Sequence, residues 1–112
     1  MNEMTSHTPL SGTAMAAPDR EVYAFFGDGT YMMAHSELLT CVQERLRVHF
    51  CLFDNSGWGC IEGLQNSQGN DTFGTVFRKR NPATGQLDGE PMPLDFAASA
   101  RAYGLTAYTV RT

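Results

Sequence analysis

Two apolar segments of this 112-residue chain, each followed at once by a polar turn that contains glycine, constrain its fold most. The first segment, residues 22–26, is rich in strand-forming side chains and ends at the sequence GDG at 27–29. The second segment, residues 48–53, is closed by Asp-Asn-Ser-Gly at 54–57. Both segments have the length and composition of short β-strands, so the sequence predicts a strand at each position.

A helix is predicted between the two strands, over residues 36–47, because its apolar residues recur at helical spacing. These residues are Leu38, Leu39, Val42 and Leu46. Strand, helix and strand within about thirty residues form a βαβ unit with parallel strands and a right-handed crossover. The predicted fold class is therefore α/β, with a βαβ core that is part of a doubly wound parallel sheet. Ligands of such sheets bind beyond the carboxyl ends of the strands, so both polar turns are expected to face one crevice.

The remaining segments carry weaker signals. Residues 1–16 are rich in Ser, Thr and Met without periodicity, and we expect an irregular lead-in to a domain at 17–112. Residues 61–90 are polar and contain several glycines, which favours turns and loops. A helix is predicted over 94–103 and a strand over 106–110.

The composition argues against several classes of protein. Hydrophobic residues make up 42% and charged residues 18%, which is typical of globular rather than disordered chains. A net charge of −4 with few, scattered basic residues argues against nucleic acid as a partner. No apolar run approaches the roughly 18 residues of a membrane span and no signal peptide is expected, so we predict a cytoplasmic protein without a membrane partner. The three cysteines lack metal-type spacing, and we expect reduced thiols and no zinc site.

The two polar turns indicate a function through their combination. Taken alone, the sequence GDG at 27–29 is typical of a tight turn that binds nothing. At the ends of adjacent parallel strands, however, Asp28 and Asn55 would bring a carboxylate and an amide oxygen toward one point. Both are hard oxygen ligands of the kind that Mg²⁺ prefers, which leaves further positions for phosphate, carbonyl and water oxygens. Backbone N–H groups near 36 and 58–59 would serve an anionic diphosphate.

This spacing resembles the cofactor motif of thiamine-diphosphate enzymes, in which GDG is followed by Asn-Asn. Here GDG at 27–29 is followed after 24 residues by Asp-Asn. The resemblance implies that Asp28 and the Asn55 side chain are Mg²⁺ ligands, with the main-chain carbonyl of Gly57 as the third protein ligand. It also implies cofactor contacts from the surrounding residues Gly27, Gly29, Thr30, Trp58 and Gly59. Asp54 departs from the Asn-Asn pattern, at a position that does not ligate the metal.

A closer resemblance covers residues 15–112. The sequence is similar to trihydroxycyclohexane-1,2-dione hydrolases in the segments PDREVYAFFGDGTYMMAHSELLTCVQE, LFDNSGWGCIEGLQ, FGTVFRKRNPATGQLDGE and LDFAASARAYGL. This resemblance implies an enzyme that uses thiamine diphosphate and Mg²⁺ to open a cyclic 1,2-diketone ring during myo-inositol breakdown in bacteria. Asp-Asn at 54–55 and the GxLxG-type segment at 85–89 fit this family better than relatives of acetolactate synthase.

The resemblance also limits what the chain is expected to do alone. Members of the family are multidomain chains, and this sequence resembles the middle of their C-terminal cofactor domain, so we expect a fold truncated at both ends. The glutamate that activates the cofactor in the family lies on another domain of a partner subunit, and no glutamate of this sequence corresponds to it. We therefore expect no catalytic residue here, no turnover in isolation, and association with missing domains or with further copies of the chain.

Three other functions fit parts of the sequence. One is a free-standing, non-catalytic or decayed module that self-associates through exposed sheet edges. Another is part of a carboligase or decarboxylase similar to acetolactate synthase. A dinucleotide-binding domain fits least, because residues 27–32 lack the third glycine of GxGxxG. Trp58 has two interpretations, contact with a cofactor or packing within the fold.

Overall fold

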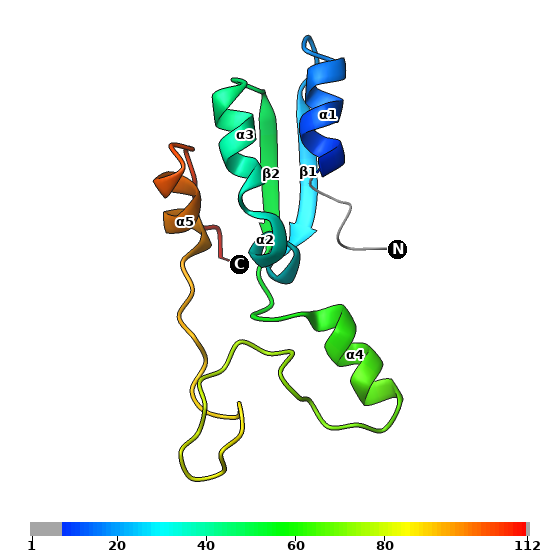
Figure 1. Cartoon of the computed structure of the whole chain (residues 1–112), viewed down its shortest axis with the longest axis vertical. Helices are drawn as coiled ribbons and strands as arrows, with labels where there is room; N and C mark the ends of the chain where they lie inside the picture. Colours follow the sequence, from blue (N-terminus) through cyan, green and yellow to red (C-terminus); the bar gives the residue numbers. More distant parts are fainter. Residues whose placement is uncertain (1–7, 112) are drawn as a thin grey trace.

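The computed structural model describes residues 8–111. Within them the elements follow in the order α1 (Thr8–Ala16), β1 (Val22–Gly27), α2 (Asp28–Ala34), α3 (Glu37–Gln43), β2 (Val48–Phe53), α4 (Gly59–Ser67) and α5 (Phe96–Ala102). Figure 1 shows the two strands side by side, with α2 and α3 in front of them and α1 beside β1. The helix α4 and the long loop that follows it extend below this body (Figure 1).

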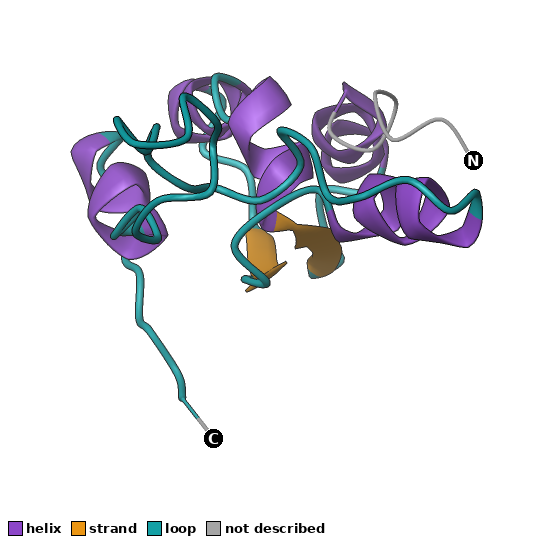
Figure 2. Cartoon of the chain, turned by 90° about the horizontal axis from the view of Figure 1, so that it is seen from below, coloured by secondary structure: helices purple, strands orange, loops and turns teal. Residues whose placement is uncertain are grey.

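The strands β1 and β2 pair in parallel, as the βαβ pattern predicts. Val22 lies opposite Val48 and Gly27 lies opposite Phe53, so the two strands end level with each other. Figure 2, which looks at the molecule from below, shows the helices gathered on one side of the strands. The predicted α/β class is confirmed, and the polar turn after each strand lies at the same edge of the sheet.

The hydrophobic core lies between the sheet and these helices. Its buried centre consists of Ala24, Phe26, Tyr31 and Leu38. The rings of Phe26 and Tyr31 stack with their centroids 6.3 Å apart, and Tyr31 packs edge-on against Phe96 of α5 at 5.4 Å. The hydroxyl of Tyr31 also donates a hydrogen bond of 2.8 Å to Ser99 Oγ. Apolar packing and a hydrogen bond therefore hold α5 against α2.

The opposite face of the sheet is aromatic and exposed. Tyr23 and Phe25 on β1 are 55% and 66% exposed, and Phe53 on β2 is 63% exposed. Tyr23 stacks on His49 with centroids 4.6 Å apart, and Phe25 stacks on Phe53 at 6.3 Å. Strands that are apolar on both faces are typical of sheets that are covered on both sides.

Residues 8–16 differ from the expectation of an irregular lead-in, because they form α1. This helix packs on β1 and α3, and Ala14 is buried with 5% of its surface exposed. Contacts with the rest of the fold stabilise α1, since its sequence has no helical periodicity. Residues 1–7 lie outside the described part, and the domain limits of 1–16 and 17–112 remain a prediction.

The helix predicted over 36–47 is shorter than expected, and α2 precedes it. It ends at Gln43 because Arg45 has a φ of 53°, in the left-handed region. The N–H of Leu46 donates to the Cys41 carbonyl at 2.9 Å and that of Arg45 donates to the Val42 carbonyl at 3.2 Å. This is a Schellman motif, which satisfies the last carbonyl groups of the helix and turns the chain toward β2.

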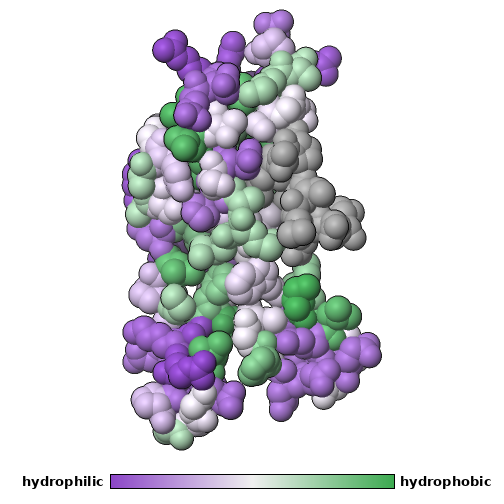
Figure 3. Space-filling model, viewed as in Figure 1, coloured by the Kyte–Doolittle hydropathy of each residue, from purple (hydrophilic) through white to green (hydrophobic). Residues whose placement is uncertain are grey.

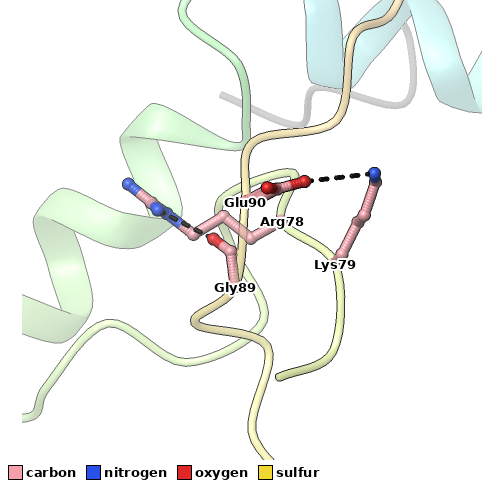
Figure 4. A network of polar contacts seen from close by, with 4 residues as sticks. All are labelled: Arg78, Lys79, Gly89 and Glu90. Carbon is pink, nitrogen blue, oxygen red and sulfur yellow. Dashed lines mark hydrogen bonds and ion pairs between the residues drawn. The ribbon is translucent and has the colours of Figure 1, made fainter. Parts of the chain in front are cut away.

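Residues 61–90 were expected to form turns and loops, but the first of them belong to α4. Beyond this helix the chain folds back on itself, with the Lys79 N–H donating to the Glu90 carbonyl at 2.9 Å. Figure 4 shows the Arg78 guanidinium donating to the Gly89 carbonyl at 3.0 Å, and the Lys79 ammonium 3.4 Å from the Glu90 carboxylate. These basic side chains therefore tie the loop to itself, and Figure 3 shows hydrophilic residues over this lower end of the molecule.

The two predictions for the C-terminal part have different outcomes. The helix predicted over 94–103 is confirmed as α5, and Asp95 caps it by accepting a hydrogen bond of 2.8 Å from the Ala98 N–H. The strand predicted over 106–110 is wrong, because these residues pair with neither β1 nor β2. Tyr108 is 84% exposed, so the β propensity of the segment has no neighbouring strand to act on.

Candidate cofactor site

The two polar turns meet at the carboxyl edge of the sheet. Asp28 follows β1 directly, begins α2 and is only 1% exposed. Asn55 and Gly57 lie in the turn that follows β2. The backbone N–H of Gly57 donates to Asp28, so the turns are in direct contact although the two partners lie 29 positions apart in the sequence.

The carboxylate of Asp28 joins the turns, and each of its oxygens accepts a hydrogen bond. Its Oδ1 accepts a hydrogen bond of 2.8 Å from the Gly29 N–H, and its Oδ2 accepts one of 3.0 Å from the Gly57 N–H. Burial raises the pKa of this carboxyl above its ordinary value of 3.8, although the two N–H groups oppose the rise. The nearby Asp54 raises the pKa further. A buried carboxylate beside a second acidic group is a favourable position for a cation.

The side-chain amide of Asn55 faces two acceptors. One terminal atom of this amide lies 3.1 Å from Asp28 Oδ1 and 2.7 Å from the Gly57 carbonyl oxygen. If that atom is the amide nitrogen, it donates a hydrogen bond to each oxygen. If it is the amide oxygen, three oxygen atoms face one another, an arrangement that a cation bound among them would stabilise. The same atoms therefore support a hydrogen-bonded state and a cation-bound state, which differ by a flip of one amide.

A pocket of about 110 Å³ opens where the turns meet. It is lined by Gly27, Asp28, Gly29, Thr30, Asn55, Gly57, Trp58, Gly59 and Cys60. The structure thus brings together all eight residues that the sequence singled out, although their role in cofactor binding stays a prediction. Cys60, which the sequence places directly after Gly59 and so beside the predicted site, also lines the pocket. Sites that enclose a whole drug-sized ligand measure about 300–1,000 Å³, so this pocket has room for one end of such a ligand.

Close packing explains two of the glycines in the pocket wall. A β-carbon on Gly29 would lie 2.7 Å from Nε1 of Trp58, and one on Gly59 would lie 2.5 Å from Nδ2 of Asn55. Trp58 also packs edge-on against Phe77, with the ring centroids 5.0 Å apart. Both interpretations of Trp58 are thus compatible with its position, because the side chain fills space within the fold and also lines the pocket.

Residues 75–77 support the second turn, a contact that no pattern in the sequence indicated. The N–H of Trp58 donates to the Thr75 carbonyl at 2.8 Å, and the N–H of Phe77 donates to the Ser56 carbonyl at 2.8 Å. Gly57 forms an antiparallel bridge with Val76. A β-carbon on Gly57 would collide with the Thr75 carbonyl, which explains why glycine stands at this position.

Other reactive side chains lie outside this pocket. His35 packs between Tyr31 and Tyr103, with ring centroids 5.7 and 6.0 Å away, and its Nδ1 is buried without a hydrogen-bond partner. Cys41 is buried and Cys51 is partly buried. In the part of the chain that the structure describes, no three His, Cys, Asp or Glu side chains form a group that could hold a metal. No helix of residues 8–111 is both long and apolar enough to cross a membrane.

The fold is that of an α/β domain, and a carboxylate, an amide and glycine backbone at the carboxyl edge of its parallel strands form a candidate ligand site. Residues 5–112 match the thiamine pyrophosphate enzyme family, C-terminal TPP binding domain. The chain belongs to this family, and the resemblance to thiamine-diphosphate enzymes in the sequence is confirmed.

Curated relatives share about half of their aligned residues with the chain. It is 54% identical over 101 residues to a 3D-(3,5/4)-trihydroxycyclohexane-1,2-dione hydrolase of Geobacillus thermodenitrificans, covering 90% of this chain. It is also 54% identical over 99 residues to the protein of that name from Bacillus thuringiensis, covering 88% of this chain. The chain spans only 16% and 15% of the lengths of these relatives.

A solved structure with the same fold supports the architecture. It is a benzoylformate decarboxylase from Polynucleobacter necessarius, with a TM-score of 0.69 and 21% sequence identity. The alignment covers 96% of this chain and 18% of the decarboxylase chain. At this identity the likeness concerns the fold alone.

Proposed function

We propose that the chain provides the diphosphate- and Mg²⁺-binding part of a cytoplasmic, thiamine-diphosphate-dependent hydrolase that opens a cyclic 1,2-diketone ring in myo-inositol breakdown. Membership of the TPP-binding family supports the cofactor. The names of relatives at 54% identity support the substrate class. The aligned part is a small share of those relatives, so the substrate is proposed for an assembly that contains more than these residues.

The observation that carries the proposal is the meeting of Asp28, Asn55 and Gly57. Magnesium binds oxygens at about 2.0–2.1 Å in an octahedron, so adjacent ligand oxygens lie about 2.9 Å apart. The Asn55 amide atom lies 3.1 Å from Asp28 Oδ1 and 2.7 Å from the Gly57 carbonyl oxygen, and these values bracket that spacing. One carboxylate, one side-chain amide oxygen and one carbonyl oxygen form a hard donor set that suits Mg²⁺. The donor chemistry of this chain therefore fits the metal that we propose.

The residues around the metal position suit the diphosphate of the cofactor. Glycine backbone at Gly27, Gly29 and Gly59 allows close approach, and the hydroxyl of Thr30 adds a donor to the pocket wall. The nine-residue helix α4 begins at Gly59, where its first N–H groups have no partner within the helix. When bound, thiamine diphosphate supplies the thiazolium carbon that carries the chemistry. The part of this chain is to hold and orient the anionic end, so that the rest of the cofactor extends out of the small pocket.

We propose that the chain has no turnover in isolation and works as part of a larger assembly or homo-oligomer. Asp28 carries the only carboxylate among the residues that line the pocket, which include no His, Lys, Arg or Glu, and in the proposal this carboxylate is committed to the metal. A positioned acid or base for proton transfer would therefore come from another part of the assembly. Turnover of a cyclic 1,2-diketone by the purified chain with thiamine diphosphate and Mg²⁺ would contradict this.

Calorimetric titration tests the binding proposal. Thiamine diphosphate is titrated into the chain with Mg²⁺ and with EDTA, and binding is expected only with the metal. Asp28→Ala and Asn55→Ala should each abolish it, because they remove a proposed ligand. Asp71→Ala changes an exposed aspartate beyond the far end of α4 and should leave cofactor binding unchanged. Equal binding with and without metal, or by the Asp28→Ala variant, would refute the proposed site.

A second candidate function is a non-catalytic module that self-associates, and the exposed aromatic face of the sheet favours it. Phe25 and Phe53 are more than 60% exposed and stack on each other, which is unusual for a face in contact with water. A folded oligomer that binds no thiamine diphosphate would favour this function over the first. A carboligase similar to acetolactate synthase would differ in its substrate, which turnover by the complete assembly would distinguish.

A further inference from the structure

We propose that Asp54 is a positioning residue, which holds the second turn in the shape that directs Asn55 and Gly57 toward the Mg²⁺ position. This inference rests on the proposed function and deepens it. Asp54 does not supply a metal ligand. It acts through the backbone of Ser56, the residue between the two proposed ligands of this turn.

The conformation of Ser56 is the feature that requires an explanation. Its φ is 62°, in the left-handed region that residues with a side chain rarely adopt. Asp54 Oδ1 accepts a hydrogen bond of 2.9 Å from the Ser56 N–H. A bond from an Asp side chain to the N–H two residues later is an Asx turn, which replaces a backbone turn and fixes the local path of the chain. Asp54 therefore stabilises an otherwise unfavourable residue.

The backbone of Ser56 is fixed on both sides. The Asp54 carboxylate holds its N–H, and the N–H of Phe77 donates to its carbonyl at 2.8 Å. Ser56 is thus the point at which the chain turns between Asn55 and Gly57. On one side of it the Asn55 amide faces Asp28, and on the other the Gly57 N–H donates to Asp28. A change of φ at Ser56 would move both groups relative to that carboxylate.

Asp54 also carries a negative charge near Asp28, so its charge is the alternative explanation for any effect on the metal. The side chain of Asp54 is exposed, and solvent and salt screen exposed charges strongly. The hydrogen bond to Ser56 needs an acceptor oxygen and no charge. An asparagine at position 54 keeps the acceptor and loses the charge, so it separates the two explanations.

The test compares three variants by calorimetry with Mg²⁺ and thiamine diphosphate. Asp54→Ala should weaken binding about tenfold, which corresponds to the loss of one good hydrogen bond. Asp54→Asn should bind within about twofold of the original chain, because Asn also forms Asx turns. The double variant Asp54→Ala with Ser56→Gly should recover most of the loss, because glycine adopts positive φ without support. Asp71→Ala serves as the control for removal of an exposed acidic side chain.

Each outcome decides the matter. If Asp54→Asn binds the cofactor as weakly as Asp54→Ala, the charge of Asp54 rather than its hydrogen bond affects binding, and the proposal is overturned. The proposal is also overturned if Asp54→Ala binds the cofactor as tightly as the original chain, or if the double variant binds as weakly as Asp54→Ala. If the original chain binds no cofactor, the proposed function fails, and amide hydrogen exchange then tests Asp54 separately. Faster exchange at Ser56 and Gly57 in Asp54→Ala, but not in Asp54→Asn, would support the positioning role, and unchanged exchange would refute it.

Discussion

Trp58 occupies the space that a side chain at position 29 would need. A β-carbon on Gly29 would lie 2.7 Å from the indole Nε1, closer than atoms in ordinary contact approach. Gly29 follows β1 and Trp58 follows β2, so this packing holds the two turns of the site at a fixed separation. The absence of a side chain at position 29 thus determines where one wall of the pocket lies.

We predict that Gly29→Ala displaces Trp58 and destabilises the fold by about 1–3 kcal/mol, as overpacking generally does. Because the chain has a single tryptophan, its fluorescence should report the displacement directly. Gly63→Ala is the matched control, since a β-carbon at Gly63 in α4 meets no atom within 4 Å. Alanine there should stabilise the helix by about 0.5–1 kcal/mol. Thermal unfolding of both variants measures the contrast. Equal shifts of the unfolding temperature in the same direction would contradict the packing argument.

The raised pKa of Asp28 gives the stability of the chain a defined pH dependence. Burial and then the neighbouring Asp54 disfavour the charged form in the folded state, so protonation of Asp28 favours folding. This stabilisation is complete below the ordinary carboxyl value of 3.8 and is lost as the pH rises through the raised pKa. Without metal, the free energy of unfolding relative to Asp28→Asn should therefore fall as the pH rises toward neutrality.

The binding of Mg²⁺ should have the opposite pH dependence, because the metal binds the ionised carboxylate. Its apparent affinity is expected to fall as the pH is lowered through the pKa of Asp28. Urea unfolding at several pH values, with EDTA and with Mg²⁺, measures both effects. If the difference in the free energy of unfolding between the original chain and Asp28→Asn does not change with pH, Asp28 does not titrate in this way.

The sequence predicted the meeting of the two polar turns better than it predicted the periphery of the fold. Asp28 and Asn55 each follow a strand, and parallel strands place their carboxyl ends at one edge, so two short patterns sufficed to bring them together. The support of Gly57 by Val76 could not be predicted in this way. It depends on a loop that returns across the site after α4, and no periodic pattern marks such a contact.

The wrong predictions share a physical cause, which is that tertiary contacts override local tendency. Residues 8–16 lack a helical pattern and become helical where they pack on β1 and α3. Residues 106–110 have strand propensity and remain unpaired, because a strand needs a neighbour.

Cysteine reactivity should report occupation of the pocket. Cys60 is exposed and lines the pocket, Cys51 is partly buried on β2, and Cys41 is buried in α3. Burial, and then the charge of Glu37, raise the pKa of the Cys41 thiol, which lowers its reactive thiolate fraction. Iodoacetamide should therefore modify Cys60 first and Cys41 last, as peptide mass spectrometry can measure. Thiamine diphosphate with Mg²⁺ should slow the modification of Cys60 several-fold and leave the rate at Cys51 unchanged, whereas equal protection of both would indicate a general stabilisation.

The exposed aromatic face of the sheet should drive self-association of the chain. Phe25 and Phe53 are 66% and 63% exposed and stack on each other, so a partner that covers them removes a continuous apolar area from water. Phe25→Lys places a charge in the centre of this face and should weaken association about tenfold or more, because an unpaired charge resists burial. Tyr108→Lys, at a residue 84% exposed outside the sheet, is the control and should change little. Sedimentation velocity over a range of concentrations measures the association of both variants. Association that survives Phe25→Lys but not Tyr108→Lys would assign the contact to the C-terminal segment instead.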